Sequence, residues 1–396
     1  MTTLSATSST PMWAYAILVV AVVCMSSGGV WFALLTETPP LMQACWRLLL
    51  TVALQAMGFA HEWLTNPILQ DPAFWARLRR NGGLVVTIGL ALGVHFGAWG
   101  WSVAHTSLLD SLLLVCSTPL LLVVILSLRW LYRRVVGGTP VVPRPPHAVC
   151  ESQSSLLTTS ATSHDVDPSW FRTVICPFPA LAPTALEVVG AVVGFSGVVL
   201  LLTTASSDQH DVHPVTLAGN AAALLGALAI LVYLEGGSSC RKWMPLFAYA
   251  LPVTAIAAFE LAIASLVLEP STTLLGVGPT ALFGFLGDGR RFGVAFGAAA
   301  VSGMLGHTCA NLAVKYVSPL LISVAVLWEP LLGGCIGYLV GVQAPPDVTA
   351  VVAAPLLLGG AFLVTLGARQ TGPDHVVLTK QCDTDDEAEG ERRGIL

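Results

Sequence analysis

Long apolar stretches alternate with short polar links along this chain, and ten of the stretches are long enough to cross a bilayer as a helix. They cover residues 12–35, 40–60, 83–105, 107–131, 185–205, 215–235, 245–268, 293–315, 318–341 and 347–368. Links as short as 36–39 predict antiparallel neighbours. A soluble domain carries about 25% charged residues, whereas this chain has 10% and is 55% hydrophobic. The pattern therefore predicts an all-α polytopic membrane protein and excludes the soluble globular classes.

The ninth apolar stretch, 318–341, carries a carboxylate and a proline at its middle, Glu329 and Pro330. A charge at the bilayer centre costs about 2.5 kcal/mol or more, so such a Glu normally faces a cavity or a partner. The proline removes a backbone hydrogen bond and weakens the helix at the same place. Small residues then recur every four positions, a pattern typical of close helix packing: Gly333, Gly337 and Gly341. Together these features predict a packed helix that lines a polar cavity.

A related pattern occurs in the first half of the chain. Residues 107–121 align with 318–332 at a constant offset of 211, so that Pro119 matches Pro330 and Thr118 matches Glu329. Proline-interrupted spans at corresponding places in two halves point to the binding site of a transporter. Five spans in each half would invert the second half relative to the first, which is the geometry of alternating-access carriers.

Composition divides the chain into parts. Residues 1–132 form the first repeat with spans one to four, and 185–205 is the fifth span that closes it. Between them, 133–184 is rich in Pro, Ser and Thr and is expected to be a disordered cytosolic linker. Residues 206–368 form the second repeat, and 369–396 form an acidic, disordered tail.

Basic residues predict the orientation, because cytoplasmic loops carry an excess of Lys and Arg. With the N-terminus in the cytosol, 15 of the 18 Lys and Arg residues face inward, two face outward, and Arg47 lies within a span. Both termini are therefore predicted to be cytosolic. The first apolar run is too long for a cleaved signal peptide, so we expect it to stay as a span. The sequence does not distinguish the plasma membrane from an endomembrane.

Four short motifs, in this order, resemble the EamA-type membrane proteins of the drug/metabolite transporter superfamily. They are Pro40–Leu48 with an Arg early in span two, Ser107–Pro119 with its proline, Gly219-Asn220 at the start of span six, and Trp328-Glu329-Pro330. The resemblance covers most of the chain outside 133–184 and the C-terminal tail. It implies an inverted pair of five-helix bundles around a central solute cavity. It also implies a carrier of amino acids, nucleotide sugars, drugs or other metabolites.

Charged residues within spans are the first candidates for a site. Glu329 would bind a solute or a proton; the alternative is a packing carboxylate bonded to a neighbouring Ser or Tyr. Arg47 lies about 10 Å into span two by helical rise. It would neutralise an anionic solute, or it would snorkel to the surface. For Glu260, in span seven, a packing ion pair is the favoured role.

Histidine and tryptophan supply further candidates. His95 and Trp99 lie one turn apart, as do His307 and Asn311, so each pair shares a helix face. At the offset of 211, His307 is one residue out of register with His95. A histidine can titrate or hydrogen-bond a polar solute; the alternative is a satisfied core histidine. Trp99 and Trp328 are too deep for an interfacial belt, so they would stack on a planar solute or fill space.

Two other motifs have a simpler explanation. The tetrad Gly194–Gly197 spells the GxSG of intramembrane rhomboid proteases, with His307 as a conceivable base. It falls where span ten has Gly359-Gly360, which favours helix packing, so we expect no enzyme. The C-terminal ERRGIL, Glu391–Leu396, resembles an acidic dileucine signal for a sorting adaptor. The alternative is a plain disordered tail.

The expected function is secondary transport of a small organic metabolite or drug-like solute by alternating access. Spans one, three, four, six, eight and nine would form the cavity. Its partners would be the solute and the lipid bilayer, with proton coupling as a further expectation, and no cofactor, metal or nucleic acid is implied. The alternative is a non-transporting scaffold or a lipid-handling protein on the same fold.

Overall fold

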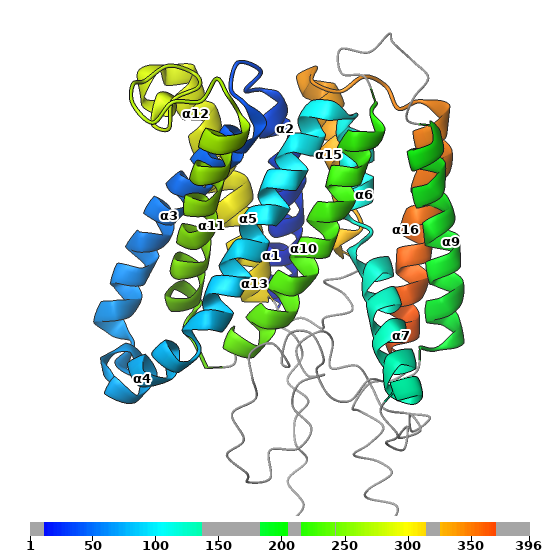
Figure 1. Ribbon diagram of the computed structural model, residues 1–396, viewed down its shortest axis with the longest axis horizontal. Helices are drawn as coiled ribbons and strands as arrows, with labels where there is room; N and C mark the ends of the chain where they lie inside the picture. Colours follow the sequence, from blue (N-terminus) through cyan, green and yellow to red (C-terminus); the bar gives the residue numbers. More distant parts are fainter. Residues whose placement is uncertain (1–11, 137–182, 205–214, 242, 314–324, 370–396) are drawn as a thin grey trace, which may run out of the picture.

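The computed structural model describes residues 12–136, 183–204, 215–241, 243–313 and 325–369, and this part of the chain is helical without a named strand (Figure 1). The helices up to the predicted linker are α1 (Met12–Ser26), α2 (Gly28–Ala33), α3 (Pro40–Thr65), η1 (Pro67–Gln70), α4 (Pro72–Arg80), α5 (Gly82–His105), α6 (Leu108–Val115) and α7 (Thr118–Val136). Those after it are α9 (Ala185–Thr204), α10 (Leu217–Arg241), α11 (Leu246–Leu268), η2 (Gly284–Gly287), α12 (Gly289–Gly297), η3 (Ala298–Thr308), α13 (Cys309–Ala313), α15 (Glu329–Val340) and α16 (Val348–Arg369).

Seven of these helical segments are long and apolar enough to cross a membrane. They are Met12–Ala33, Gly82–His105, Leu108–Tyr132, Ala185–Thr203, Leu217–Arg241, Leu246–Leu268 and Val348–Gly367. Large apolar side chains, among them Val192 and Phe259, are exposed on the outside of the bundle, as lipid-facing positions require. The protein is therefore a multi-pass membrane protein with an all-α fold.

Three of the ten predicted spans fall outside this set of seven. Span two corresponds to α3, whose buried side chains include Gln43, Arg47 and Gln55 and lower its hydropathy. Span eight is divided among α12, η3 and α13, and α15 is only 12 residues long. Residues 314–324, which include the end of the predicted eighth span and the start of the ninth, lie outside the described residues. The count of ten and the inverted repeat remain predictions.

Few of the predicted domain boundaries fall within the described residues. The first four residues of the predicted linker, 133–136, are the last turn of α7 rather than linker. The rest of that linker up to 182, and the tail from 370 with its sorting motif, lie outside the described residues. The span expected over 185–205 is α9, which begins at Ala185.

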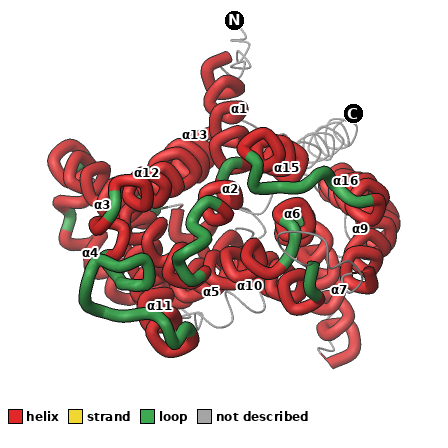
Figure 2. Tube along the Cα trace, turned by 90° about the horizontal axis from the view of Figure 1, so that it is seen from above, coloured by secondary structure: helices red, strands yellow, loops and turns green. Residues whose placement is uncertain are grey.

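The helices pack in pairs that join distant parts of the sequence (Figure 2). The most extensive contacts join α9 with α16, α5 with α10, α3 with α11, α5 with α11, and α1 with η3, and α6 also contacts α15. Two large apolar cores result, and a smaller cluster lies around Leu18 and Val22 of α1. One is built around Trp46, Ile88 and Tyr249 at the α3, α5 and α11 side. The other is built around Leu120, Leu201 and Leu357, where α7, α9 and α16 meet.

Glycine allows the α9–α16 pair to approach closely. A Cβ on Gly190 would lie 2.7 Å from the carbonyl oxygen of Gly360, and a Cβ on Gly360 would meet the backbone of Gly194. Gly194 of the GxSG tetrad therefore packs against Gly360, which agrees with the helix-packing role expected for the tetrad. Its Ser196 is exposed and donates to the Val193 carbonyl of its own helix.

The α3–α11 pair is held at both ends by carboxylates that cap the partner helix. Glu269 accepts hydrogen bonds from the backbone N–H groups of Leu41 (2.8 Å) and Met42 (3.2 Å) at the start of α3. At the other end, Glu62 accepts from Phe247 (3.0 Å) and Ala248 (3.1 Å) at the start of α11. Helix N-termini leave unpaired N–H groups and attract negative charge. Each Glu therefore accepts hydrogen bonds from donors that would find no acceptor in hydrocarbon.

Candidate functional site

A single buried guanidinium lies at the centre of the candidate site. Arg47, in the second turn of α3, is 1% exposed. Its Nη2 donates to Ser302 Oγ of η3 at 2.9 Å. Nε and Nη1 have no hydrogen-bond partner within the described residues. Snorkelling to the surface, one of the two expectations, does not occur in this conformation.

Three aromatic rings surround this guanidinium. Its Cζ lies 4.5 Å from the ring centre of Phe96, 5.5 Å from that of Phe32 and 5.6 Å from that of Trp99. Ring faces attract cations, so the rings stabilise the charge without using its N–H groups. Trp99 is itself 4% exposed and packs edge-on against Phe32, with its Nε1 unpartnered among the described residues.

The two histidines lie beside this group. His95 stacks on Trp99 at 6.3 Å, and His307 meets Phe96 edge-on at 6.0 Å. His95 Nδ1 is 2.9 Å from the Gly226 carbonyl oxygen of α10. A carbonyl can only accept, so Nδ1 carries the proton, and Nε2 of the neutral ring is left as an acceptor. His95 is thus a half-satisfied core histidine with one nitrogen still available.

An unusual helix brings Ser302 and His307 to the same site. The segment η3, Ala298–Thr308, is an 11-residue π-helix. In an α-helix, residues five apart differ by about 140° in direction. A π-helix closes i to i+5 hydrogen bonds, so residues five apart stack along one side. This winding brings both side chains toward Arg47.

Glu329 lies across the site from Arg47, close enough for the two charges to interact. It is the first residue of α15, directly after the turn at Leu327-Trp328. It accepts no hydrogen bond from a described Ser or Tyr, which the packing alternative required. In the first half, α6 ends at Val115 and α7 begins at Thr118, so the helix is interrupted just before Pro119. The break before Pro330 in the second half corresponds to it.

The remaining candidates are placed differently. Trp328 is 58% exposed and lies outside the group around Arg47. Asn311 is in α13, and its side chain is outside the described structure. Glu260 lies against Gly93 of α5, and its Oε2 has no hydrogen-bond partner among the described residues. The ion pair expected for Glu260 is therefore absent from this part of the chain.

The structure therefore gathers Arg47, His95, Trp99, His307 and Glu329 from four separate helices. Sequence reasoning missed Ser302 and the ring of Phe96, because neither residue type is unusual in an apolar span. Within the described residues no three His, Cys, Asp or Glu side chains are arranged to hold a metal ion. Chemically, the guanidinium nitrogens that have no partner among the described residues are donors of the kind that match a carboxylate or a phosphate.

Comparisons with known proteins add little to this geometry. No protein-family model and no curated protein matches the chain. A solved structure described only as "Crystal structure of protein" is similar, with 19% sequence identity over 90% of this chain and 98% of its own, and a TM-score of 0.43. At that score the likeness carries no argument about fold or function.

Proposed function

We propose that this protein is a secondary transporter that moves a small organic solute across the membrane by alternating access, and that Arg47 binds an anionic group of that solute. The observation that carries this proposal is the buried guanidinium, two of whose nitrogens, Nε and Nη1, have no partner in the part of the chain that the structure describes. An intramembrane ionisable residue normally marks a solute or ion pathway.

A purely structural arginine would have to recover the free energy that its burial costs. Removing a charge from water costs several kcal/mol, and a packing role repays that cost only when every N–H group is satisfied. Here one hydrogen bond to Ser302 is made and Nε and Nη1 are left unpaired. A carboxylate or phosphate on the solute would complete the set, because the planar guanidinium matches both groups in a bidentate way.

The pairing of helices also supports alternating access. If the halves are exchanged, span two becomes span seven, span five becomes ten, and span three becomes eight. The pairs α3–α11 and α9–α16 then map onto themselves, and α5–α10 maps onto η3–α1. All of these pairs are among the closest contacts in the bundle. Such exchange symmetry is the arrangement that lets one half rock against the other around a fixed site.

The capping carboxylates follow the same exchange. Glu62 at the end of α3 caps α11, and Glu269 at the end of α11 caps α3. A matching device at both ends of one helix pair is expected when two inverted repeats share an interface.

The test is uptake into proteoliposomes of the purified full chain. A mixture of carboxylic acids, amino acids, phosphorylated sugars and amines is offered outside, and the lumen is analysed by mass spectrometry. We expect at least one anionic solute to accumulate with the wild-type protein and not with Arg47→Met. Arg77→Met is the matched control, since Arg77 also lies over an aromatic ring, Trp243 at 4.6 Å, but is exposed on α4.

Two outcomes would reject the proposal. Uptake of the same solutes by wild type and Arg47→Met would remove Arg47 from the mechanism. No uptake of any solute, with protein that is folded and inserted, would favour the non-transporting scaffold on this fold.

A further inference from the structure

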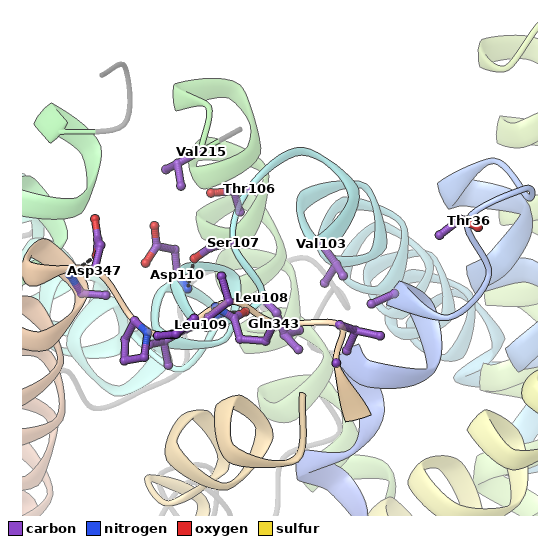
Figure 3. Close-up of a pocket in the computed structure, with 17 residues that line it drawn as sticks. Thr36, Val103, Thr106, Ser107, Leu108, Leu109, Asp110, Val215, Gln343 and Asp347 are labelled. Carbon is purple, nitrogen blue, oxygen red and sulfur yellow. Dashed lines mark hydrogen bonds between the residues drawn. The ribbon is translucent and has the colours of Figure 1, made fainter. Parts of the chain in front are cut away.

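A separate cavity of about 350 Å³ opens at one end of the bundle, where the end of α5, the start of α6 and the α15–α16 link meet (Figure 3). This volume lies within the usual range for small-molecule sites. Most of the wall is apolar and includes Val103, Leu108, Leu109 and Val215. None of the lining residues is a Lys, Arg or His.

Asp110 brings a buried carboxylate to this cavity. It lies in the first turn of α6, where Ser107 Oγ accepts a hydrogen bond from its backbone N–H at 3.0 Å. The residue is only 5% exposed, yet its Oδ1 has no hydrogen-bond partner among the described residues. An unpaired buried carboxylate oxygen is costly, so the geometry lacks a donor at Oδ1.

A second carboxylate stands next to the first. Asp347, in the link before α16, lies beside Asp110 in Figure 3, and the two negative charges are close enough to interact. One oxygen of Asp347 already caps α16 by accepting from Ala350 N–H at 2.7 Å. Like charges at this distance repel, so a cation placed between them would relieve both the repulsion and the missing hydrogen bond.

The number of free oxygen ligands in the cavity wall indicates which kind of cation fits. Calcium takes six to eight oxygen ligands and magnesium six. Here the side chain of Gln343 is already in use. Gln343 Oε1 accepts from Leu109 N–H at 3.2 Å, and its Nε2 donates to the Ala344 carbonyl at 3.0 Å. An ammonium group needs only a few acceptors for its three N–H donors, and its carbon chain would lie against the apolar wall.

We propose that this cavity binds the protonated amino group of a small organic amine through Asp110, with Asp347 as the second carboxylate. The site is distinct from the group around Arg47, and its occupation can be measured without any transport assay.

The experiment measures the melting temperature of the purified full chain in nanodiscs during titration. The probe is butylammonium chloride, with butanol as the neutral analogue and calcium chloride as the inorganic cation. We expect a saturable rise with butylammonium alone. Asp110→Asn should weaken the apparent affinity about tenfold or more, because it removes a charge-assisted hydrogen bond.

Asp288→Asn is the matched control. It removes one negative charge at the same end of the bundle, from an exposed residue that caps α12 through Arg291 N–H at 2.9 Å, and Asn caps equally well. We expect its titration to equal that of the wild type.

Should Asp110→Asn fail to fold, Ala344→Trp replaces it. This change fills the cavity from an exposed position and keeps both carboxylates, so it should abolish the rise. The proposal is overturned by unchanged binding in Asp110→Asn or Ala344→Trp, by equal effects of butylammonium and butanol, by a response to calcium instead, or by no saturable rise.

Discussion

Arg47→Met is the substitution that separates a binding role from a structural one, because the two roles predict opposite changes in stability. The change removes one hydrogen bond from a charged donor, about 1.5–3 kcal/mol, and a set of ring contacts worth about 2 kcal/mol when desolvated. It also removes the penalty for burying a guanidinium, which is several kcal/mol. Met preserves most of the apolar stem and adapts to irregular space.

The sum of these contributions predicts that the free energy of unfolding of Arg47→Met equals that of the wild type or exceeds it by up to about 2 kcal/mol. Replacing buried ions by apolar side chains is commonly neutral or stabilising by about 1–4 kcal/mol. Solute uptake should nevertheless be lost. The assay is SDS-induced unfolding of the purified full chain, beside uptake by the same preparation, with Arg77→Met as the exposed control.

A loss of about 3 kcal/mol or more in Arg47→Met would refute this reasoning. It would mean that the guanidinium is the structural counter-ion of Glu329, since stranding one member of a buried pair costs that much. The double variant Arg47→Met with Glu329→Gln checks the same point. A structural pair predicts that the second change restores stability, whereas a solute site predicts that it adds nothing.

Three further outcomes can be checked in the same preparations. Glu329→Gln keeps the shape of the side chain and should change the free energy of unfolding by only about 1 kcal/mol. Solute flux should fall or lose its pH dependence. Normal flux at every pH would exclude Glu329 from the transport mechanism. Glu269→Ala leaves the Leu41 and Met42 N–H groups unpaired and should cost about 1–2 kcal/mol by SDS unfolding. Gly360→Ala should cost about 1–3 kcal/mol, because its Cβ would meet the backbone of α9, whereas a Cβ on Gly359 meets nothing within 4 Å. Equal effects at these two glycines would refute the packing of α9 on α16.

Sequence periodicity was sufficient for the class of fold, because apolar length has few explanations in a chain with 10% charged residues. It predicted the helices at 40–60 and 293–315 as well, but it did not predict the buried polar side chains of α3 or the change of winding within 293–315. Hydropathy records composition along the chain and carries no information on how many residues form each turn.

The candidate site was predicted residue by residue but not as a group. Charge in an apolar span is visible, so Arg47 and Glu329 could be named. Their neighbours could not, because Ser302 and Phe96 come from other helices and are ordinary residues for a membrane span. Asp110 had a visible signal that went unused, as a carboxylate within the stretch that aligns with the Glu329 region. Which partners a buried charge meets is decided by tertiary packing.

The π-winding of η3 makes this stretch intolerant of changes in length. Loops absorb an added or deleted residue with little effect, and an α-helix passes the resulting rotation to everything beyond it. In η3 the π-winding places more residues in each turn than an α-helix does. Deleting a single alanine before Ser302 would leave the two polar residues in place relative to each other but turn them together away from α3. Deleting one residue between Ser302 and His307 would let the helix tighten and would separate them. Two deletions of equal size would thus have different consequences, and the spacing between these two side chains is the quantity that selection on this helix would have to preserve.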